Sequence, residues 1–211
     1  MNQTKAQYFD NQVNEPWASS AFGPEETAKI ERMLRQAEVT PGMHILEPGC
    51  GTGRLTEILA DRVGVGGAVL ALDISPEMVE ACRSRMAEKK NVQVTCGPLE
   101  EAALSTGAFD LAICHNVFHH FDDKRAALET MIRVLKDSGR LIIFHFMNSA
   151  AINDLHRKAH ESVLEDLMPP ASEMERLIEG CGLILECLFD DGDGYLLSAR
   201  AGGQLHFRAV P

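Results

Sequence analysis

The sequence predicts an α/β fold in which helices cover both faces of a largely parallel sheet. Three observations lead to this prediction. Short apolar runs alternate five times with amphipathic segments, two apolar runs then follow each other directly, and "DGDG" at 191–194 joins that last pair. Such alternation is typical of parallel sheets flanked by helices. The last pair predicts a hairpin, and hence one antiparallel strand.

Strands are predicted where short apolar runs stand between turn residues. "MHILE", "AVLALD" and "VQVTC" are the first three of these runs, and "FDLAICH" is the fourth. The complete set of predicted strands is 43–47, 68–73, 92–96, 109–115, 140–146, 183–190 and 195–200.

Helices are predicted where apolar residues recur three or four positions apart. Pro24 suits the first turn of the first helix. Ser75 is the expected N-cap of the third helix, with Pro76 at its first position. The predicted helices are 23–37, 53–63, 75–90, 123–139, 149–167 and 172–182.

Single residues predict three further helix boundaries. Gly139 is expected at the C′ position of the fourth helix, where glycine commonly ends a helix. Pro169 and Pro170 are expected to stop the fifth helix. Ser172 and Glu175 predict a capping box at the start of the last helix.

Length and charge narrow the functional classes. The chain has 211 residues, enough for one sizeable core, so we expect a single domain over 1–211. The net charge of −11 and the lack of a basic run argue against a nucleic-acid surface.

No apolar stretch approaches the roughly 20 residues that span a bilayer. The six cysteines form no CxxC pair and lie mostly in apolar segments, which predicts reduced thiols in the cytoplasm.

A glycine-rich loop follows the first predicted strand. Gly49, Gly51 and Gly53 stand at alternate positions between that strand and a helix. Glycine allows a sharp turn and lets a ligand touch the backbone. A tight turn without a ligand needs one glycine or two, so three favour a nucleotide-like ligand.

Two acids indicate the chemistry of this ligand. Glu47 ends the first strand, and a negative charge there disfavours a phosphate but favours a cationic group. Arg54 stands at the sixth position of the loop, where a dinucleotide fold would have Gly or Ala. Asp73 ends the second strand, where a carboxylate accepts both hydroxyls of a ribose. A nucleoside with a positive charge and no phosphate fits S-adenosylmethionine.

These segments resemble the motifs of class I S-adenosylmethionine-dependent methyltransferases, of the small stand-alone kind similar to enzymes of ubiquinone and menaquinone biosynthesis. The similar segments cover about residues 40–147 and are "ILEPGCGTGRL", "VLALDISPEMVEAC", "CGPLEEAAL", "FDLAICHNVFHHF" and "LKDSGRLIIF". The resemblance implies a Rossmann-like three-layer sandwich. Its seven strands would have the order 3-2-1-4-5-7-6, with strand 7 antiparallel.

The resemblance also implies a set of cofactor contacts. Glu47 and the glycine loop would hold the methionine part, Asp73 would hold the ribose, and apolar residues would pack on the adenine. Pro98 departs from the family pattern, because an acid that bonds the adenine amine commonly stands there. The predicted cofactor-binding residues are Glu47, Gly49, Cys50, Gly51, Gly53, Asp73, Ile74, Met78, Leu99, His115 and Tyr8.

Histidines are concentrated in the segments that border the acceptor pocket of this fold. A neutral imidazole accepts protons near pH 7 and so suits a general base. We predict this catalytic role for His119, His120 and His145, and substrate contacts for Asn116, His156 and His160. His156 and His160 are four apart on one predicted helix and should point the same way.

The i, i+4 histidine pair also has metal-ligand spacing. A metal ion held by His145, His156 and His160 therefore stays open as an alternative to a general base. The rest of a metalloprotease signature is missing, and the chemistry of methyl transfer needs no metal.

The segments outside the motifs are expected to shape the pocket. Residues 1–22 include Tyr8, Phe9 and Trp17 and are predicted to form a lid, and 146–171 are predicted to insert on the substrate side. The sequence thus predicts methyl transfer to a small-molecule acceptor. Two alternatives stay open: a cofactor-binding module without turnover, and a nicotinamide-dependent oxidoreductase.

Overall fold

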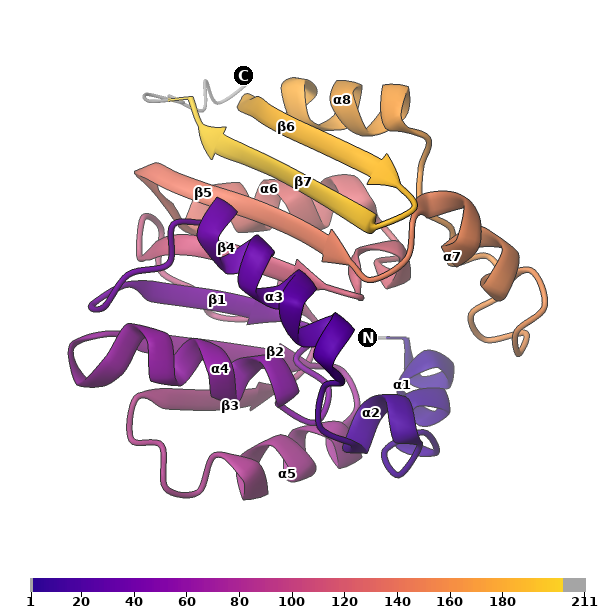
Figure 1. Cartoon of the computed structure of the whole chain (residues 1–211), viewed down its shortest axis with the longest axis horizontal. Coiled ribbons are helices and arrows are strands. Elements are labelled where there is room, and N and C mark those ends of the chain that lie inside the picture. Colours follow the sequence, from indigo (N-terminus) through magenta and orange to yellow (C-terminus); the bar gives the residue numbers. More distant parts are fainter. Residues whose placement is uncertain (1, 203–211) are drawn as a thin grey trace.

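The computed structural model describes residues 2–202, which contain one seven-stranded sheet (Figure 1). Its strands are β1 His44–Pro48, β2 Ala68–Asp73, β3 Val92–Cys96, β4 Phe109–His115, β5 Leu135–His145, β6 Leu183–Asp191 and β7 Gly194–Ala201. Their order is β3-β2-β1-β4-β5-β7-β6. β7 is antiparallel to both of its neighbours, and the other pairs are parallel. The predicted topology is confirmed.

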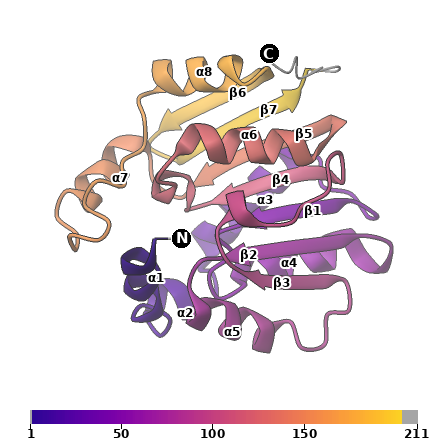
Figure 2. The same ribbon diagram turned by 180° about the vertical axis from the view of Figure 1, so that it is seen from behind.

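Eight helices are described around the sheet, and five of them form its two outer layers. The eight helices are α1 Gln3–Asp10, α2 Pro16–Ser19, α3 Pro24–Gln36, α4 Arg54–Val63, α5 Pro76–Arg85, α6 Lys124–Val134, α7 Ser149–His156 and α8 Ala171–Gly180, with 3-10 turns η1 Gly64–Gly66, η2 Leu99–Glu101 and η3 Phe118–His120. α3, α4 and α5 cover one face of the sheet, and α6 and α8 cover the other (Figures 1 and 2). Within the described residues, no helix combines the length and apolar character needed to cross a membrane.

Two apolar clusters join the three layers. Ile45 faces the cluster that contains Leu59 of α4, whereas its neighbour Leu46 faces the cluster that contains Met131 of α6. Successive side chains of a strand point to opposite faces, so both neighbours are buried. This explains why the central strands read as continuous apolar runs rather than as alternating ones.

The prediction that the fourth helix ends at Gly139 is wrong. α6 ends at Val134, and Leu135 already pairs with Phe109 of β4. Lys136 contacts the carboxylate of Asp110 at 2.7 Å, which holds the same segment beside β4. Residues 135–139 therefore form the first part of β5, because pairing with β4 outweighs the local helical pattern.

The prediction that the fifth helix extends to residue 167 is also wrong. α7 ends at His156, and the chain then turns back towards it. The Asn153 side chain holds the returning segment, since its Nδ2 donates to the Met168 carbonyl at 3.0 Å and its Oδ1 accepts from the Met168 N–H at 2.8 Å. His160 lies beyond the helix, so it does not share a helix face with His156.

Two other boundaries differ from the prediction. α5 ends at Arg85 rather than near residue 90. α8 begins at Ala171 with Pro170 as its N-cap and no side-chain cap, so the predicted capping box of Ser172 and Glu175 is not formed.

α1, α2 and α7 lie beyond the carboxyl ends of the parallel strands, at the right of Figure 1. The first and second belong to residues 1–22, and the third belongs to 146–171. Ligands of open α/β sheets bind at this edge. The two segments predicted to shape a pocket thus lie where such a pocket is expected.

Candidate cofactor and acceptor site

A cavity of about 670 Å³ lies at this edge of the sheet, between the glycine loop, α1 and α7. Its volume is within the range that suits small-molecule ligands. Every residue predicted for the cofactor lines it except Gly53, and it is also lined by Asn116, His119, His120, His145 and His156.

The glycines of the loop have left-handed φ angles of +72°, +53° and +84° at positions 49, 51 and 53. A Cβ on Gly49 would lie 2.2 Å from Cγ2 of Val117, and one on Gly53 would lie 2.7 Å from Sγ of Cys82. These two glycines therefore permit close packing. A Cβ on Gly51 would meet nothing within 4 Å, and this residue lines the cavity. Gly51 is where a ligand can approach the bare backbone.

Asp73 fixes the loop and faces the cavity. The N–H of Gly51 donates to its Oδ2 at 2.9 Å, and the N–H of Ser75 donates to its Oδ1 at 2.9 Å. Burial raises the pKa of Asp73, and these backbone bonds oppose the rise. Each carboxylate oxygen accepts more than one hydrogen bond, so both remain able to accept from a ribose hydroxyl.

Glu47 is a buried acid at the end of β1. It is 2% exposed, and its Oε2 has no hydrogen-bond partner among residues 2–202. Burial raises the pKa of Glu47 well above its ordinary value of 4.5, although a hydrogen bond from Thr56 opposes this. An unpaired buried carboxylate is costly, and a cationic ligand group beside it would relieve that cost. The site therefore fits a ligand that carries a positive charge.

His115 is enclosed by phenylalanines. Its ring stacks on Phe144 with centroids 5.5 Å apart and meets the edges of Phe22 and Phe146 at 5.9 and 4.7 Å. Burial lowers the pKa of His115 to about 3, so the ring is neutral at physiological pH. Next to it, Asn116 accepts the Phe146 N–H through Oδ1 at 3.2 Å, which ties the end of β4 to the end of β5.

Four further histidines meet in the other half of the cavity. They come from η3, β5 and α7. The ring centroid of His119 lies 3.9 Å from that of His120, 4.6 Å from that of His156 and 5.1 Å from that of His145. The structure thus brings the three predicted general-base candidates together with one predicted substrate contact.

A family model described as a methyltransferase domain matches residues 46–143, from β1 to β5. The chain is 27% identical over 175 residues to demethylmenaquinone methyltransferase of Lactococcus lactis, covering 80% of this chain and 68% of that protein. It is 32% identical over 139 residues to the ubiquinone/menaquinone biosynthesis C-methyltransferase UbiE of Ectopseudomonas mendocina, covering 64% and 54%. The chain therefore carries a methyltransferase domain and resembles the class I S-adenosylmethionine-dependent methyltransferases.

Solved structures agree with this assignment at the level of the fold. A methyltransferase from Aquifex aeolicus superposes with a TM-score of 0.67 at 20% identity, covering 93% of this chain and 98% of that one. Geranyl diphosphate C-methyltransferase from Streptomyces coelicolor superposes with a TM-score of 0.73 at 14% identity, covering 95% and 98%. The methyltransferase spans only about half the length of the matched UbiE protein, so the names of these relatives do not fix its acceptor.

Two predicted site residues of the methyltransferase lie outside the cavity lining. Gly53 is the N-cap of α4 and packs against Cys82. His160 is exposed, and its Nδ1 is within 2.9 Å of the Ser162 hydroxyl. Its ring stacks on Tyr8 with centroids 5.5 Å apart, so it contacts the predicted lid instead of the cavity.

Lys5 ties α1 to the half of the cavity that is lined by histidines. It is 3% exposed, and its Nζ lies 2.7 Å from Asp122 and 2.8 Å from Asp166. The same Nζ donates to the His120 carbonyl at 2.7 Å. Neither Lys5 nor Asp166 was predicted as a site residue, because the two are 161 positions apart in the sequence. No local pattern marks such a pair.

We expect Lys5→Met to release α1 from the methyltransferase. Removing one partner of a buried ion pair costs about 3–5 kcal/mol, because the remaining charge stays buried. Hydrogen exchange in residues 3–10 should therefore become faster while exchange in the central strands stays unchanged. Lys89→Met is the matched control, since its partner Asp61 is well exposed and such pairs contribute about 0–1 kcal/mol. Equal exchange in both variants would show that Lys5 does not hold the helix.

We expect Glu47→Gln to stabilise the ligand-free methyltransferase at neutral pH. Burial raises the pKa of Glu47 in the folded protein. The contribution of Glu47 to the free energy of unfolding is therefore fully present below about pH 4.5 and is lost as the pH rises through the folded-state pKa. The amide of the variant has no charge for burial to penalise. Near neutral pH, the free energy of unfolding of the variant should therefore exceed that of the parent protein by about 1–3 kcal/mol. Urea unfolding across this pH range tests the expectation. Identical pH dependence in the variant and the parent protein would contradict it.

Proposed function

We propose that this chain transfers the methyl group of S-adenosylmethionine to a small-molecule acceptor bound beside His119, His120, His145 and His156. The observation that carries the proposal is the continuity of one cavity. It is lined at one end by Asp73 and the glycine loop and at the other end by these histidines. A donor and an acceptor bound in one cavity are held in the proximity that displacement at carbon requires.

The chain's own residues would act by binding and by proton transfer. S-adenosylmethionine supplies an activated methyl group, held by Glu47, Asp73 and the backbone at Gly51. Burial lowers the pKa of His119 and His145 well below the ordinary value, and that of His120 to about 4. The three rings are therefore neutral near pH 7, and a neutral imidazole accepts a proton from an acceptor hydroxyl or thiol.

Three features support a small acceptor rather than a macromolecule. His119, His145 and His156 at the acceptor end are buried, the net charge is −11, and related proteins include a demethylmenaquinone and a geranyl diphosphate methyltransferase. Residues 1–22 would close the cavity as a lid, with Tyr8 and Phe9 lying over His160 and His120. We also propose that the protein is located in the cytoplasm, because its six cysteines are free thiols.

Turnover separates this proposal from a cofactor-binding module. Purified protein is incubated with S-adenosylmethionine and a small-molecule extract of cells, and S-adenosylhomocysteine is quantified by mass spectrometry. We expect product that depends on both the protein and the extract, and a labelled methyl group in one extract component. Asp73→Ala, which removes the ribose contact, is the negative control. Tight cofactor binding without product in any extract would favour the binding module.

A further inference from the structure

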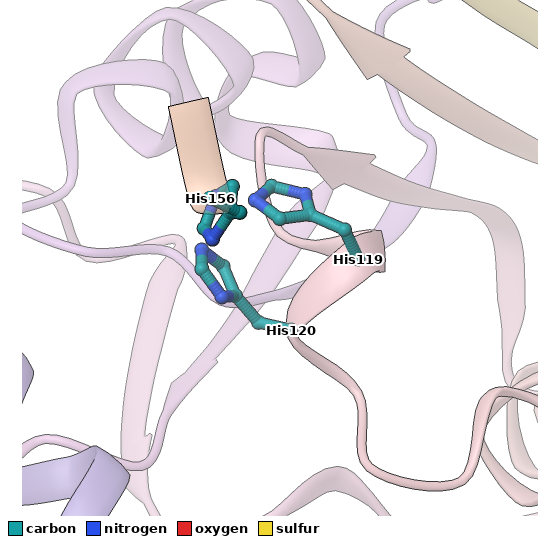
Figure 3. Close-up of side chains that lie close together, drawn as sticks. All are labelled: His119, His120 and His156. Carbon is teal, nitrogen blue, oxygen red and sulfur yellow. The ribbon is translucent and has the colours of Figure 1, made fainter. Parts of the chain in front are cut away.

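The rings of His119, His120 and His156 face one another, as Figure 3 shows, and all three residues line the cavity. One nitrogen from each ring lies within 4.8 Å of those of the other two. His119 and His156 are buried, and His120 is partly buried. Among residues 2–202, no hydrogen bond joins any of these three rings to another. Three polar rings therefore lie close together without forming hydrogen bonds to one another.

Hydrogen bonds on the outer side of the cluster fix two of the rings. Nδ1 of His120 lies 2.7 Å from the carboxylate of Asp166, and Nδ1 of His156 lies 3.0 Å from the Val163 carbonyl. Both partners only accept hydrogen bonds, so each Nδ1 carries the proton. Nε2 of both rings then has a free lone pair. A carboxylate or carbonyl behind the ring is the usual support of a metal-ligating histidine.

His119 supplies an independent observation. Its Nδ1 is buried and has no hydrogen-bond partner in the part of the chain that the structure describes. A buried polar atom without a partner is rare and costly. The three rings already bring one nitrogen each to within 4.8 Å of the others, which is the arrangement that a shared ion needs. Neutral imidazole is the form that ligates a metal.

We propose that His119, His120 and His156 together bind one divalent transition-metal ion of the zinc type. Three imidazole nitrogens about 2.0–2.1 Å from the ion, with a fourth position open, are a known arrangement for zinc. Tetrahedral ligands at that distance lie about 3.4 Å apart, so the rings would close inwards slightly. This set shares only His156 with the trio expected from the sequence, because His160 is exposed on the lid side.

The charges around the cluster permit an added cation. Lys5 and Lys124 approach from one side, but Lys5 is paired with Asp122 and Asp166. The Lys124 ammonium is bound by the carbonyls of His119 and Phe121, each at 3.1 Å. The two lysines and the two aspartates cancel in formal charge. Neither these groups nor the neutral imidazole ligands would therefore neutralise the positive charge of a bound ion.

The open position would face the acceptor. A divalent ion there lowers the pKa of a hydroxyl or thiol that binds it, and the released proton passes to solvent. This role rests on the proposed function and would take the place of proton transfer by His119 and His120, whereas metal binding itself does not rest on it. Acceptors with a hydroxyl or thiol group are the class that such a site would select.

Metal binding is tested directly on the full chain after treatment with a chelator. Zn²⁺ is titrated by calorimetry, and Co²⁺ is added as a probe whose visible absorption reports tetrahedral nitrogen ligands. We expect one ion per chain. His156→Ala and His120→Gln should each weaken binding more than 100-fold, and Asp166→Asn about 10–100-fold, the usual effect of losing a partner behind a ligand. His160→Ala is the matched control and should bind the ion with unchanged affinity.

The outcomes separate the two proposals. Circular dichroism first shows which variants are folded, and His156→Ala and His120→Gln provide two independent ligand removals. A folded parent protein that binds no Zn²⁺ or Co²⁺ would overturn the metal site. So would an ion whose affinity is the same in both ligand variants and in the control. Binding of S-adenosylmethionine, measured without metal, tests the proposed function separately, and it should persist in the metal-free protein.

Discussion

Gly51→Ala is expected to abolish binding of S-adenosylmethionine while leaving the protein folded. A Cβ at this position meets no protein atom within 4 Å, but it would extend into the cavity where the ligand approaches the backbone. The left-handed φ of +53° costs an alanine about 1–2 kcal/mol, which a folded domain of this size tolerates. Gly51→Val should show the same loss of binding with a larger loss of stability, because a β-branched residue is more strained there.

Two other glycines make this prediction specific. Gly42 has a φ of +90°, and a Cβ added to it would meet open space, but it does not line the cavity. Gly42→Ala should therefore lose stability through backbone strain and keep its affinity for S-adenosylmethionine. Gly49→Ala should destabilise the ligand-free protein further, because its Cβ would overlap Val117 at 2.2 Å. Thermal unfolding with and without S-adenosylmethionine measures both effects. Full ligand-induced stabilisation in Gly51→Ala would show that the ligand does not contact this part of the loop.

Asp73→Ala is expected to weaken binding of S-adenosylmethionine by about 2–4 kcal/mol, because two charge-assisted hydrogen bonds to a ribose are lost. That range corresponds to roughly 30-fold to 1,000-fold in the dissociation constant. The variant also loses the acceptors of the Gly51 and Ser75 N–H groups, so some loss of stability should accompany the loss of affinity. Calorimetry at a temperature where the variant is folded measures the affinity alone.

Asp110→Ala is the matched control for Asp73. Its carboxylate also accepts a backbone N–H, that of His44 at 2.8 Å, but it lies at the start of β4, outside the cavity lining. We expect it to lose stability and retain affinity. If Asp73→Ala binds the ligand as tightly as Asp110→Ala, the ribose is held elsewhere.

The central fold was predictable because its signals are local. Each strand of the parallel core is a short apolar run, and both faces are buried by helices that follow in the sequence. The positions of Glu47, Asp73 and the glycine loop were predictable for the same reason. Each stands directly after a strand, and the carboxyl ends of parallel strands lie at one edge of the sheet.

Element ends were less predictable, because tertiary contacts decide them. Gly139 suggested a helix cap, but pairing of Leu135 with Phe109 of β4 placed this segment in β5. The 149–167 pattern suggested one long helix, but the bonds of Asn153 to Met168 turned the chain back after His156. In both cases a partner distant in sequence offers hydrogen bonds that an isolated helix lacks.

The sequence by itself determined the alternation of strands and helices, and its resemblance to a known family predicted the strand order. It also placed the glycine loop and several histidines at the carboxyl ends of the strands. Only the tertiary structure decided which histidines meet. His156 faces His119 and His120 because the turn after α7 directs it inwards, whereas His160 is directed towards Tyr8. Lys5 and Asp166 behind the cluster are joined across 161 positions. Periodicity reports which face of an element is apolar, but it carries no information on how distant loops fold against each other.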